Sequence, residues 1–160
     1  MAILPILRWP DARLTTVCTP VTTDVAALAV DMLDTMYDAP GRGLAAPQVG
    51  ALLRLFVMDV TWKEGTPAPQ IFINPRIVWR SENHVDGPEG CLSLPGLSTT
   101  VSRSDQLRLM WQDLDGGAQD QLFDGFAAVC IQHECDHLDG ILTLDHLPTA
   151  ARAAAEMALQ

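Results

Sequence analysis

The sequence predicts an α+β fold, with helices near the two ends of the chain and mainly antiparallel strands between them. Three observations lead to this class. Apolar residues recur at helical spacing in residues 25–36 and 124–138. Runs rich in β-forming residues lie between these two segments. Two of the runs flank Asp115-Gly116-Gly117, which is typical of a hairpin turn and therefore of an antiparallel pair.

The first helix is predicted to begin near Val25 and to end before Pro40. Its apolar side chains, up to Met36, recur every three or four residues, so one face of the helix should pack on the core. Thr23 or Asp24 can cap its first turn, because short polar side chains accept hydrogen bonds from the free backbone N–H groups there.

Two strands are expected after this helix. Residues 41–50 are punctuated by glycine and proline, and a β-rich run follows at residues 52–60. A loop at 62–69 separates this run from a second strand at 71–79, in which Pro75 indicates an edge position or a bulge.

A loop is predicted for residues 81–98, which contain five glycines or prolines, with only a short extended piece at 91–94. Strands are expected at 106–114 and 119–123, on either side of the hairpin turn.

Two further helices complete the prediction. One should run from Asp124, which can cap it, to Leu138, with Gly140 as its stop signal. A third, alanine-rich helix can start at Thr149.

The length and composition favour one globular domain. With 160 residues, of which 48% are apolar and 19% charged, the chain can bury a core and lacks the polar excess of a disordered segment. The formal net charge of -10 repels phosphate backbones, which argues against direct binding of nucleic acid.

The cysteines and the apolar runs indicate in which cellular compartment the protein works. The four cysteines contain no C-x-x-C pair and do not resemble a disulfide framework, which favours a reducing environment. Residues 1–10 lack the features of a secretion signal, and no run approaches the roughly 18 apolar residues of a membrane span. We therefore expect a soluble cytoplasmic protein without membrane contact.

The second predicted helix carries His133-Glu134-Cys135-Asp136-His137, which fits the pattern H-E-x-x-H. Residues four apart lie about 40° apart around a helix, so both imidazoles can reach one metal ion. Glu134 lies beside that face, where it can accept a proton from a water and pass it to a leaving group. Cys135 points about 200° away from His133 and is expected in the core.

A catalytic metal site needs a third protein ligand and an open position. Spacing alone leaves Cys91 in the glycine-rich loop, Cys130 one turn before the histidines, and several carboxylates as candidates. A loop can place a thiolate opposite two imidazoles, whereas the short side chain of Cys130 would have to bind from the helix itself. Cys91 is therefore favoured, and Cys130 fits a small buried residue.

Three segments resemble, in this order, the three motifs of the peptide deformylase family: GRGLAAPQ at residues 41–48, EGCLS at 89–93 and QHECDH at 132–137. The opening segment at 6–14 also looks like that of the family, so the resemblance spans most of the chain. It implies a peptide deformylase-like fold, with antiparallel sheets around a central metal-binding helix, and a single catalytic domain formed by residues 1–160.

The resemblance implies a hydrolase that removes the formyl group from formyl-methionyl peptides of nascent proteins and releases formate. One divalent ion would be bound, Fe(II) as the native metal in much of the family, with Zn(II) or Ni(II) also found. Glu134 would protonate the departing nitrogen, while the side-chain amide of Gln48 and the backbone N–H of Leu92 would stabilise the developing oxyanion. The implied metal ligands are Cys91, His133 and His137.

The resemblance also assigns residues to the substrate and to the support of the metal. Phe126, Val129 and Cys130 precede the histidines on the same helix and would line a pocket for the methionine side chain. Arg103 and Asp136 could pair to orient the metal-binding segments, or form a solvated ion pair. The substrate-binding positions are Arg42, Gly43, Leu44, Gly90, Phe126, Val129 and Cys130.

Two features depart from relatives. Many members of the family carry an aliphatic residue in place of Arg42, near the mouth of the side-chain pocket. A guanidinium there would narrow or recharge the pocket, so Arg42 is predicted to favour a substrate with an acidic group or an altered side chain. Residues 150–160 carry only one basic residue, Arg152, so we expect only weak or transient contact with the ribosome. A monomer is expected.

Two other functions compete with this hypothesis. A zinc endopeptidase built on H-E-x-x-H would not need Cys91. A non-catalytic peptide-binding or metal-storage module would need neither Glu134 as an acid/base nor Gln48 as an oxyanion donor. A structural zinc site would also normally be closed by four protein ligands.

Overall fold

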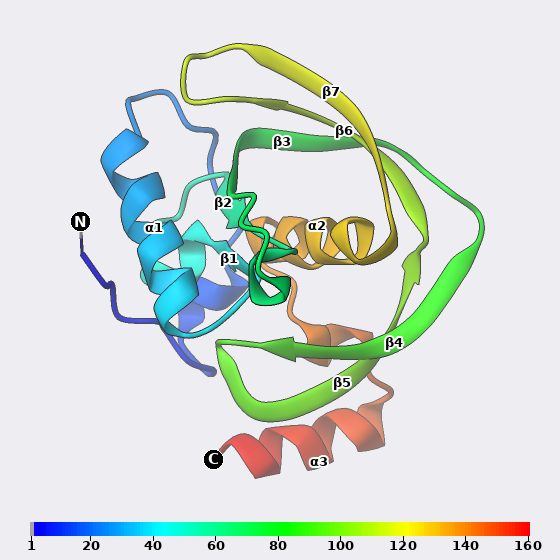
Figure 1. The fold of residues 1–160 in the computed structure, drawn as a ribbon. Helices are drawn as coiled ribbons and strands as arrows, with labels where there is room; N and C mark the ends of the chain where they lie inside the picture. Colours follow the sequence, from blue (N-terminus) through cyan, green and yellow to red (C-terminus); the bar gives the residue numbers. More distant parts are fainter. Residues whose placement is uncertain (1) are drawn as a thin grey trace.

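The computed structural model describes residues 2–160, which form two β-sheets and three α-helices (Figure 1). Short 3-10 helices connect several of these elements. The helices are α1 (Ala26–Asp38), α2 (Gly125–Leu138) and α3 (Thr149–Leu159). The strands are β1 (Gly43–Ala45), β2 (Leu55–Met58), β3 (Gln70–Arg80), β4 (His84–Cys91), β5 (Leu94–Ser104), β6 (Gln106–Gln112) and β7 (Ala118–Asp124).

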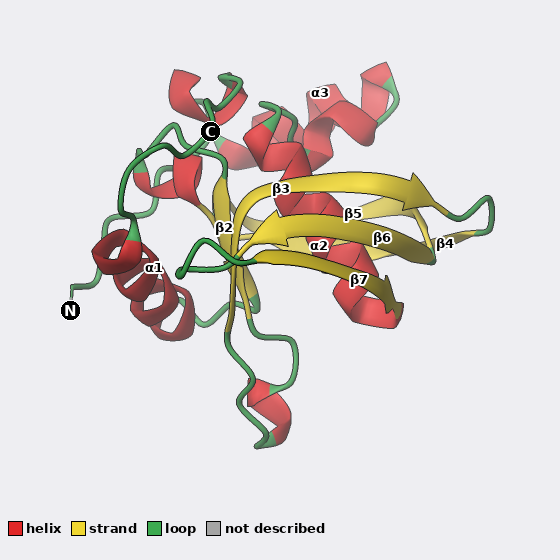
Figure 2. Ribbon diagram, turned by 90° about the horizontal axis from the view of Figure 1, so that it is seen from above, coloured by secondary structure: helices red, strands yellow, loops and turns green. Residues whose placement is uncertain are grey.

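The strands of both sheets pair antiparallel, as predicted. One sheet has five strands in the order β1-β2-β3-β6-β7, and the other consists of β4 and β5. In Figure 1, α2 lies between the two sheets, with β3, β6 and β7 on one side and β4 and β5 on the other. Figure 2 shows the same helix crossing the strands of both sheets. The predicted α+β fold, with antiparallel sheets around the H-E-x-x-H helix, is confirmed.

All three predicted helices are present. α1 ends at Asp38, and Asp24 holds its start, because one carboxylate oxygen accepts a hydrogen bond from the N–H of Ala26 at 2.8 Å. Asp124 precedes α2, but its side chain makes no capping hydrogen bond, so this part of the prediction was wrong. Asp124 itself has the extended backbone of a capping residue, but Gly125 after it has a φ of 57°, so the first turn does not start with the usual helical backbone. Within residues 2–160, no helix is long and apolar enough to span a membrane.

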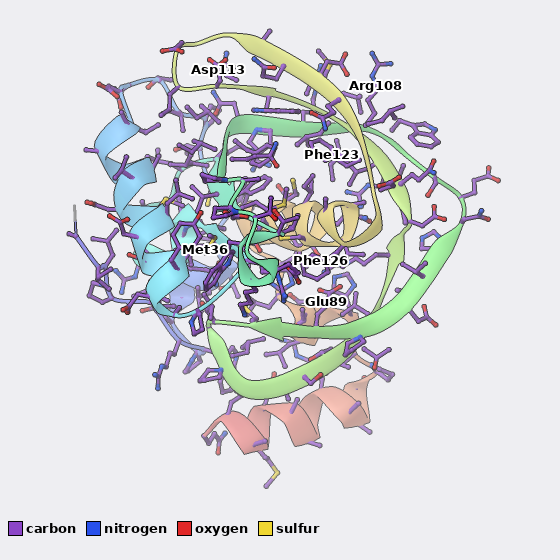
Figure 3. All side chains as sticks on the ribbon, viewed as in Figure 1. Met36, Glu89, Arg108, Asp113, Phe123 and Phe126 are labelled. Carbon is purple, nitrogen blue, oxygen red and sulfur yellow. The ribbon has the colours of Figure 1, made fainter. Side chains whose placement is uncertain are left out.

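The predicted hairpin is confirmed as β6 and β7. Asp113 organises its turn, since one carboxylate oxygen accepts hydrogen bonds from the N–H groups of Asp115 (2.9 Å) and Gly117 (2.8 Å) (Figure 3). The register between β3 and β6 shifts around Pro75, which confirms a bulge there. β3 lies between β2 and β6, so the alternative of an edge strand is excluded.

The loop predicted for residues 81–98 was wrong. This segment contains β4 and the first part of β5, which pair without interruption from His84↔Ser104 to Gly90↔Ser98. Each of the two strands has only one partner, so prolines such as Pro88 and Pro95 do not interrupt a ladder on their free sides. Most side chains of β4 are exposed, so the segment lacks the apolar alternation by which a strand is recognised.

Buried apolar side chains form three clusters. The first lies between α2 and the five-stranded sheet and includes Cys135, as predicted. The second packs α1 on β1 and β2. The third joins segments near both ends of the chain beside the β4–β5 turn, and Cys91 packs against it. The buried members of the third cluster are Leu14, Leu94, Leu142, Leu144 and Ala155.

Candidate active site

The functional side chains of α2 lie on one side of the helix. Phe126, Cys130 and Glu134 are spaced four residues apart and follow one another along a single stripe, next to His133 and His137. This side of α2 faces β1 and the turn between β4 and β5, so residues from three parts of the chain can meet there.

Three potential metal ligands converge at this point. One atom of each of Cys91, His133 and His137 lies within 4.8 Å of the other two, and the Cys91 sulfur is 3.4 Å from Nε2 of His137. Cys130 is not part of this group, so the fold brings Cys91, and not Cys130, together with the two histidines. One thiolate and two imidazoles suit a divalent transition metal and leave further positions open.

Glu89 supports the first histidine, a role that sequence reasoning missed. Its Oε1 lies 2.8 Å from Nδ1 of His133, which leaves the other ring nitrogen free to face the cluster. Arg103 holds the same carboxylate through two hydrogen bonds, of 2.9 and 3.0 Å, and also pairs with Asp136 at 2.6 Å. The predicted contact of Arg103 with Asp136 is therefore present, and Glu89 extends it to the metal ligand.

Burial and neighbouring charges shift the pKa values of the titratable groups in the site. Burial raises the pKa of Glu134 to about 7, and its Oε1 has no hydrogen-bond partner among residues 2–160. Burial lowers the pKa of His133, but Glu134, Cys91 and Glu89 outweigh it and raise this pKa well above its usual value. Burial and the charges of His133 and Arg103 shift His137 the other way and lower its pKa well below its usual value. The unpartnered oxygen of Glu134 suits a water beside the ligands.

Gln48 is buried beside the cluster and its amide is held in one orientation. Its Oε1 accepts a hydrogen bond from the N–H of Ala45 (2.9 Å), and its Nε2 donates to Oγ of Ser93 (3.0 Å). The same Nε2 lies 3.7 Å from the sulfur of Cys91. The donor end of Gln48 therefore points to the metal ligands, and Leu92 lies next to Cys91 in the turn.

Gly43 lies so close to α2 that any side chain there would have to displace Glu134 and Cys130. A Cβ at this position would be 2.6 Å from Oε2 of Glu134 and 2.9 Å from the sulfur of Cys130. Both distances are shorter than real Cβ contacts, so the missing side chain lets β1 approach Glu134 directly.

A cavity of about 790 Å³ opens beside these residues. In Figure 3, Glu89 on β4 and Phe126 on α2 lie on the side of that helix that faces the two-stranded sheet, and both line the cavity. Leu44 does not line it, because the side chain after Gly43 points to the other face of the strand and is buried in the second cluster. The predicted residues that do line it are Arg42, Gly43, Gln48, Gly90, Cys91, Leu92, Phe126, Val129, Cys130, His133 and Glu134.

Comparison with known proteins identifies this arrangement. The family model described as polypeptide deformylase matches residues 3–153. The chain belongs to the peptide deformylase family. A peptide deformylase of Afipia carboxidovorans is 48% identical over 155 residues, which cover 95% of this chain and 91% of that protein.

Solved peptide deformylase structures share the whole fold. The crystal structure of the Legionella pneumophila enzyme has a TM-score of 0.93 at 40% identity and covers 99% of this chain and 94% of its own. The peptide deformylase of Ehrlichia chaffeensis, solved in complex with actinonin, has a TM-score of 0.92 at 35% identity, with 99% and 96% covered. The fold expected from the resemblance is thus confirmed for this peptide deformylase.

Proposed function

We propose that this deformylase hydrolyses the formyl amide of N-formyl-methionyl nascent peptides and releases formate and a free amine. One observation carries the proposal: the convergence of Cys91, His133 and His137 beside a buried Glu134 whose Oε1 has no hydrogen-bond partner among residues 2–160. These ligands would hold one divalent ion, with Fe(II) as the native metal and Zn(II) or Ni(II) as substitutes. When bound, such an ion supplies a Lewis acid that polarises a carbonyl and acidifies a water.

Glu134 would serve as the acid/base. Its pKa of about 7, raised by burial, allows the carboxylate to accept a proton from a water and to return it at neutral pH. The amine nitrogen is a poor leaving group unless it is protonated, so Glu134 would deliver this proton as the bond to the formyl carbon breaks.

Gln48 and Leu92 would stabilise the charge on the formyl oxygen. Ser93 and Ala45 hold the amide of Gln48 in place, and its second N–H, which points to the Cys91 sulfur at 3.7 Å, would turn to the formyl oxygen. The backbone N–H of Leu92 would be the second donor. Loss of one such donor costs about 2.7–4 kcal/mol of transition-state stabilisation in other hydrolases.

The cavity beside Glu134 would receive the peptide. Phe126, Val129 and Cys130 offer an apolar wall of α2 for the methionine side chain, and thioethers pack well against aromatic rings. Gly43 and Gly90 would let the peptide backbone approach β1 and β4 closely, whereas Leu44 could contribute only through its backbone.

We also propose that residues 1–160 work as one catalytic domain and as a monomer in the cytoplasm, with weak or transient ribosome contact and no direct contact with nucleic acid or membrane. The charge of -10 and the side chain of Arg152 support this. Arg152 is the basic residue of α3, and its guanidinium is paired with Asp145 (2.6 Å) and Glu156 (2.9 Å). It is therefore not free for a phosphate backbone.

The test is formate release from formyl-Met-Ala-Ser by protein purified anaerobically with Fe(II). Glu134→Ala should abolish release with metal still bound, and Cys91→Ser should lower both metal content and release. Arg108→Gln, on the outer face of β6 (Figure 3), is the control. A zinc endopeptidase would instead cleave internal peptide bonds and tolerate Cys91→Ser, and a binding module would take up metal without release.

A further inference from the structure

A charged group lies at the mouth of the cavity, where Arg42 is placed between an aromatic ring and a carboxylate. Its guanidinium carbon is 5.4 Å from the centre of the Phe126 ring, and Nη2 is 3.2 Å from Oε1 of Glu64. A guanidinium carries five N–H donors, and the bond to Glu64 uses one of them. Since the side chain of Arg42 is 32% exposed and lines the cavity, the other donors can reach a ligand.

The position of Phe126 shows which part of a substrate could reach this guanidinium. Phe126, Cys130 and Glu134 follow one another at intervals of four residues, so Phe126 lies roughly 12 Å along α2 from Glu134. The formyl amide must lie beside Glu134. An extended side chain on the formylated residue, directed along this stripe, would cover about half of this distance and end near Cys130. Burial raises the pKa of the Cys130 thiol, and Arg42 lies close enough for its charge to oppose this shift, so the guanidinium can reach the same place from the mouth of the cavity.

Glu64 is held next to Arg42 by the 3-10 turn that carries it. The indole N–H of Trp62 donates to the carbonyl oxygen of Gly41 at 2.9 Å, and Nζ of Lys63 donates to that of Pro40 at 3.1 Å. Both contacts attach the turn to the segment directly before Arg42. The Glu64 carboxylate is nevertheless 61% exposed, so it can leave the guanidinium without breaking a buried contact.

We propose that Arg42 selects the first residue of the formylated peptide by donating hydrogen bonds to an acceptor oxygen near the end of its side chain. Glu64 weakens this selection, because it occupies the same guanidinium. The inference rests on the proposed deformylase function. Glutamate and oxidised methionine (the sulfoxide) carry such an oxygen at a length close to that of methionine, whereas norleucine does not.

The experiment compares kcat/KM for formyl-Glu-Ala-Ser and formyl-methionine sulfoxide-Ala-Ser with that for formyl-norleucine-Ala-Ser. Arg42→Ile should lower kcat/KM for the glutamate peptide, relative to the norleucine peptide, about five- to tenfold, mainly through KM. This loss lies between those expected for an exposed and for a buried charged contact. The ratio for the neutral sulfoxide should fall less. Glu64→Gln should raise the glutamate ratio about two- to fivefold.

Arg108→Gln is the matched control, since Arg108 forms an exposed pair with Asp120 (2.7 Å) on β7, away from the cavity. It should leave every ratio unchanged. A second readout is calorimetric binding of the product peptides Glu-Ala-Ser and norleucine-Ala-Ser, in which only the first should lose affinity with Arg42→Ile.

Two outcomes would overturn the proposal. The ratios could stay within twofold of wild type in Arg42→Ile, or all peptides could lose activity equally, which would mean that Arg42 only shapes the cavity. Absence of formate release from every peptide, including formyl-Met-Ala-Ser, would instead refute the deformylase function. In that case the calorimetry still decides whether Arg42 recognises the acidic side chain.

Discussion

Replacing Gly43 by alanine should displace Glu134, the proposed acid/base, without contacting Cys91, His133 or His137. The new methyl group would lie 2.6 Å from Oε2 of Glu134, whereas an ordinary contact begins at 3.4 Å, so atoms must move apart by 0.8 Å (3.4 − 2.6). β1 cannot supply this movement easily, because the neighbouring Leu44 is fully buried and paired with Val57 on β2. Glu134 and Cys130 must therefore yield.

The expected loss in kcat/KM is about 10- to 100-fold, since a misplacement of roughly 1 Å at a reacting group can cost about 100-fold. Overpacking should also lower the free energy of unfolding by about 1–3 kcal/mol. The measurements are formate release at equal metal content and urea unfolding. Gly87→Ala is the matched control on β4, since a Cβ there meets nothing within 4 Å. Activity of Gly43→Ala within threefold of wild type would refute the close approach of β1 to Glu134.

Three further predictions concern the metal and the cysteines. Glu89→Gln should weaken metal binding about 10- to 100-fold in a chelator competition, because both His133 and Arg103 lose a charged, buried partner. Unchanged metal affinity would contradict the role of Glu89 in holding His133. A chelator should abolish formate release, and added Fe(II) should restore it; release that persists at zero bound metal would rule out a metal enzyme. Burial raises the pKa of Cys135 to about 12, so its thiol stays protonated and should resist alkylation at pH 8 in native protein but not in urea; native labelling of Cys135, located by mass spectrometry, would contradict its burial.

The sequence predicts this site where the relevant spacing is local. His133 and His137 are one helical turn apart, so their convergence follows from helix geometry alone. The choice of Cys91 over Cys130 did not follow in this way, because Cys91 is 46 positions from His137 and meets it only through the packing of β4 against α2. Cys91 was favoured because a loop can place a thiolate opposite two imidazoles, and the family motifs implied the same residue.

Other parts of the site could not be predicted, for a related reason. Glu89 lies within the EGCLS segment, but nothing in the sequence shows that a glutamate between glycine and proline residues is buried against an arginine 14 positions away. The β4–β5 pair was predicted as a loop because its exposed strands tolerate Gly and Pro. Leu44 was assigned to the substrate as a motif neighbour, whereas strand alternation directs its side chain into the core.

The third apolar cluster makes assembly of the metal site depend on the order of synthesis. The turn that carries Cys91 packs on Leu14 near the start of the chain and on Ala155 of α3, which is translated after every metal ligand. A two-stranded sheet is marginal by itself, so β4 and β5 need this support to fix the thiolate. We therefore expect a nascent chain in which α3 is still inside the ribosomal tunnel to bind metal poorly. The metal site would then form only after this helix has emerged and packed on the turn.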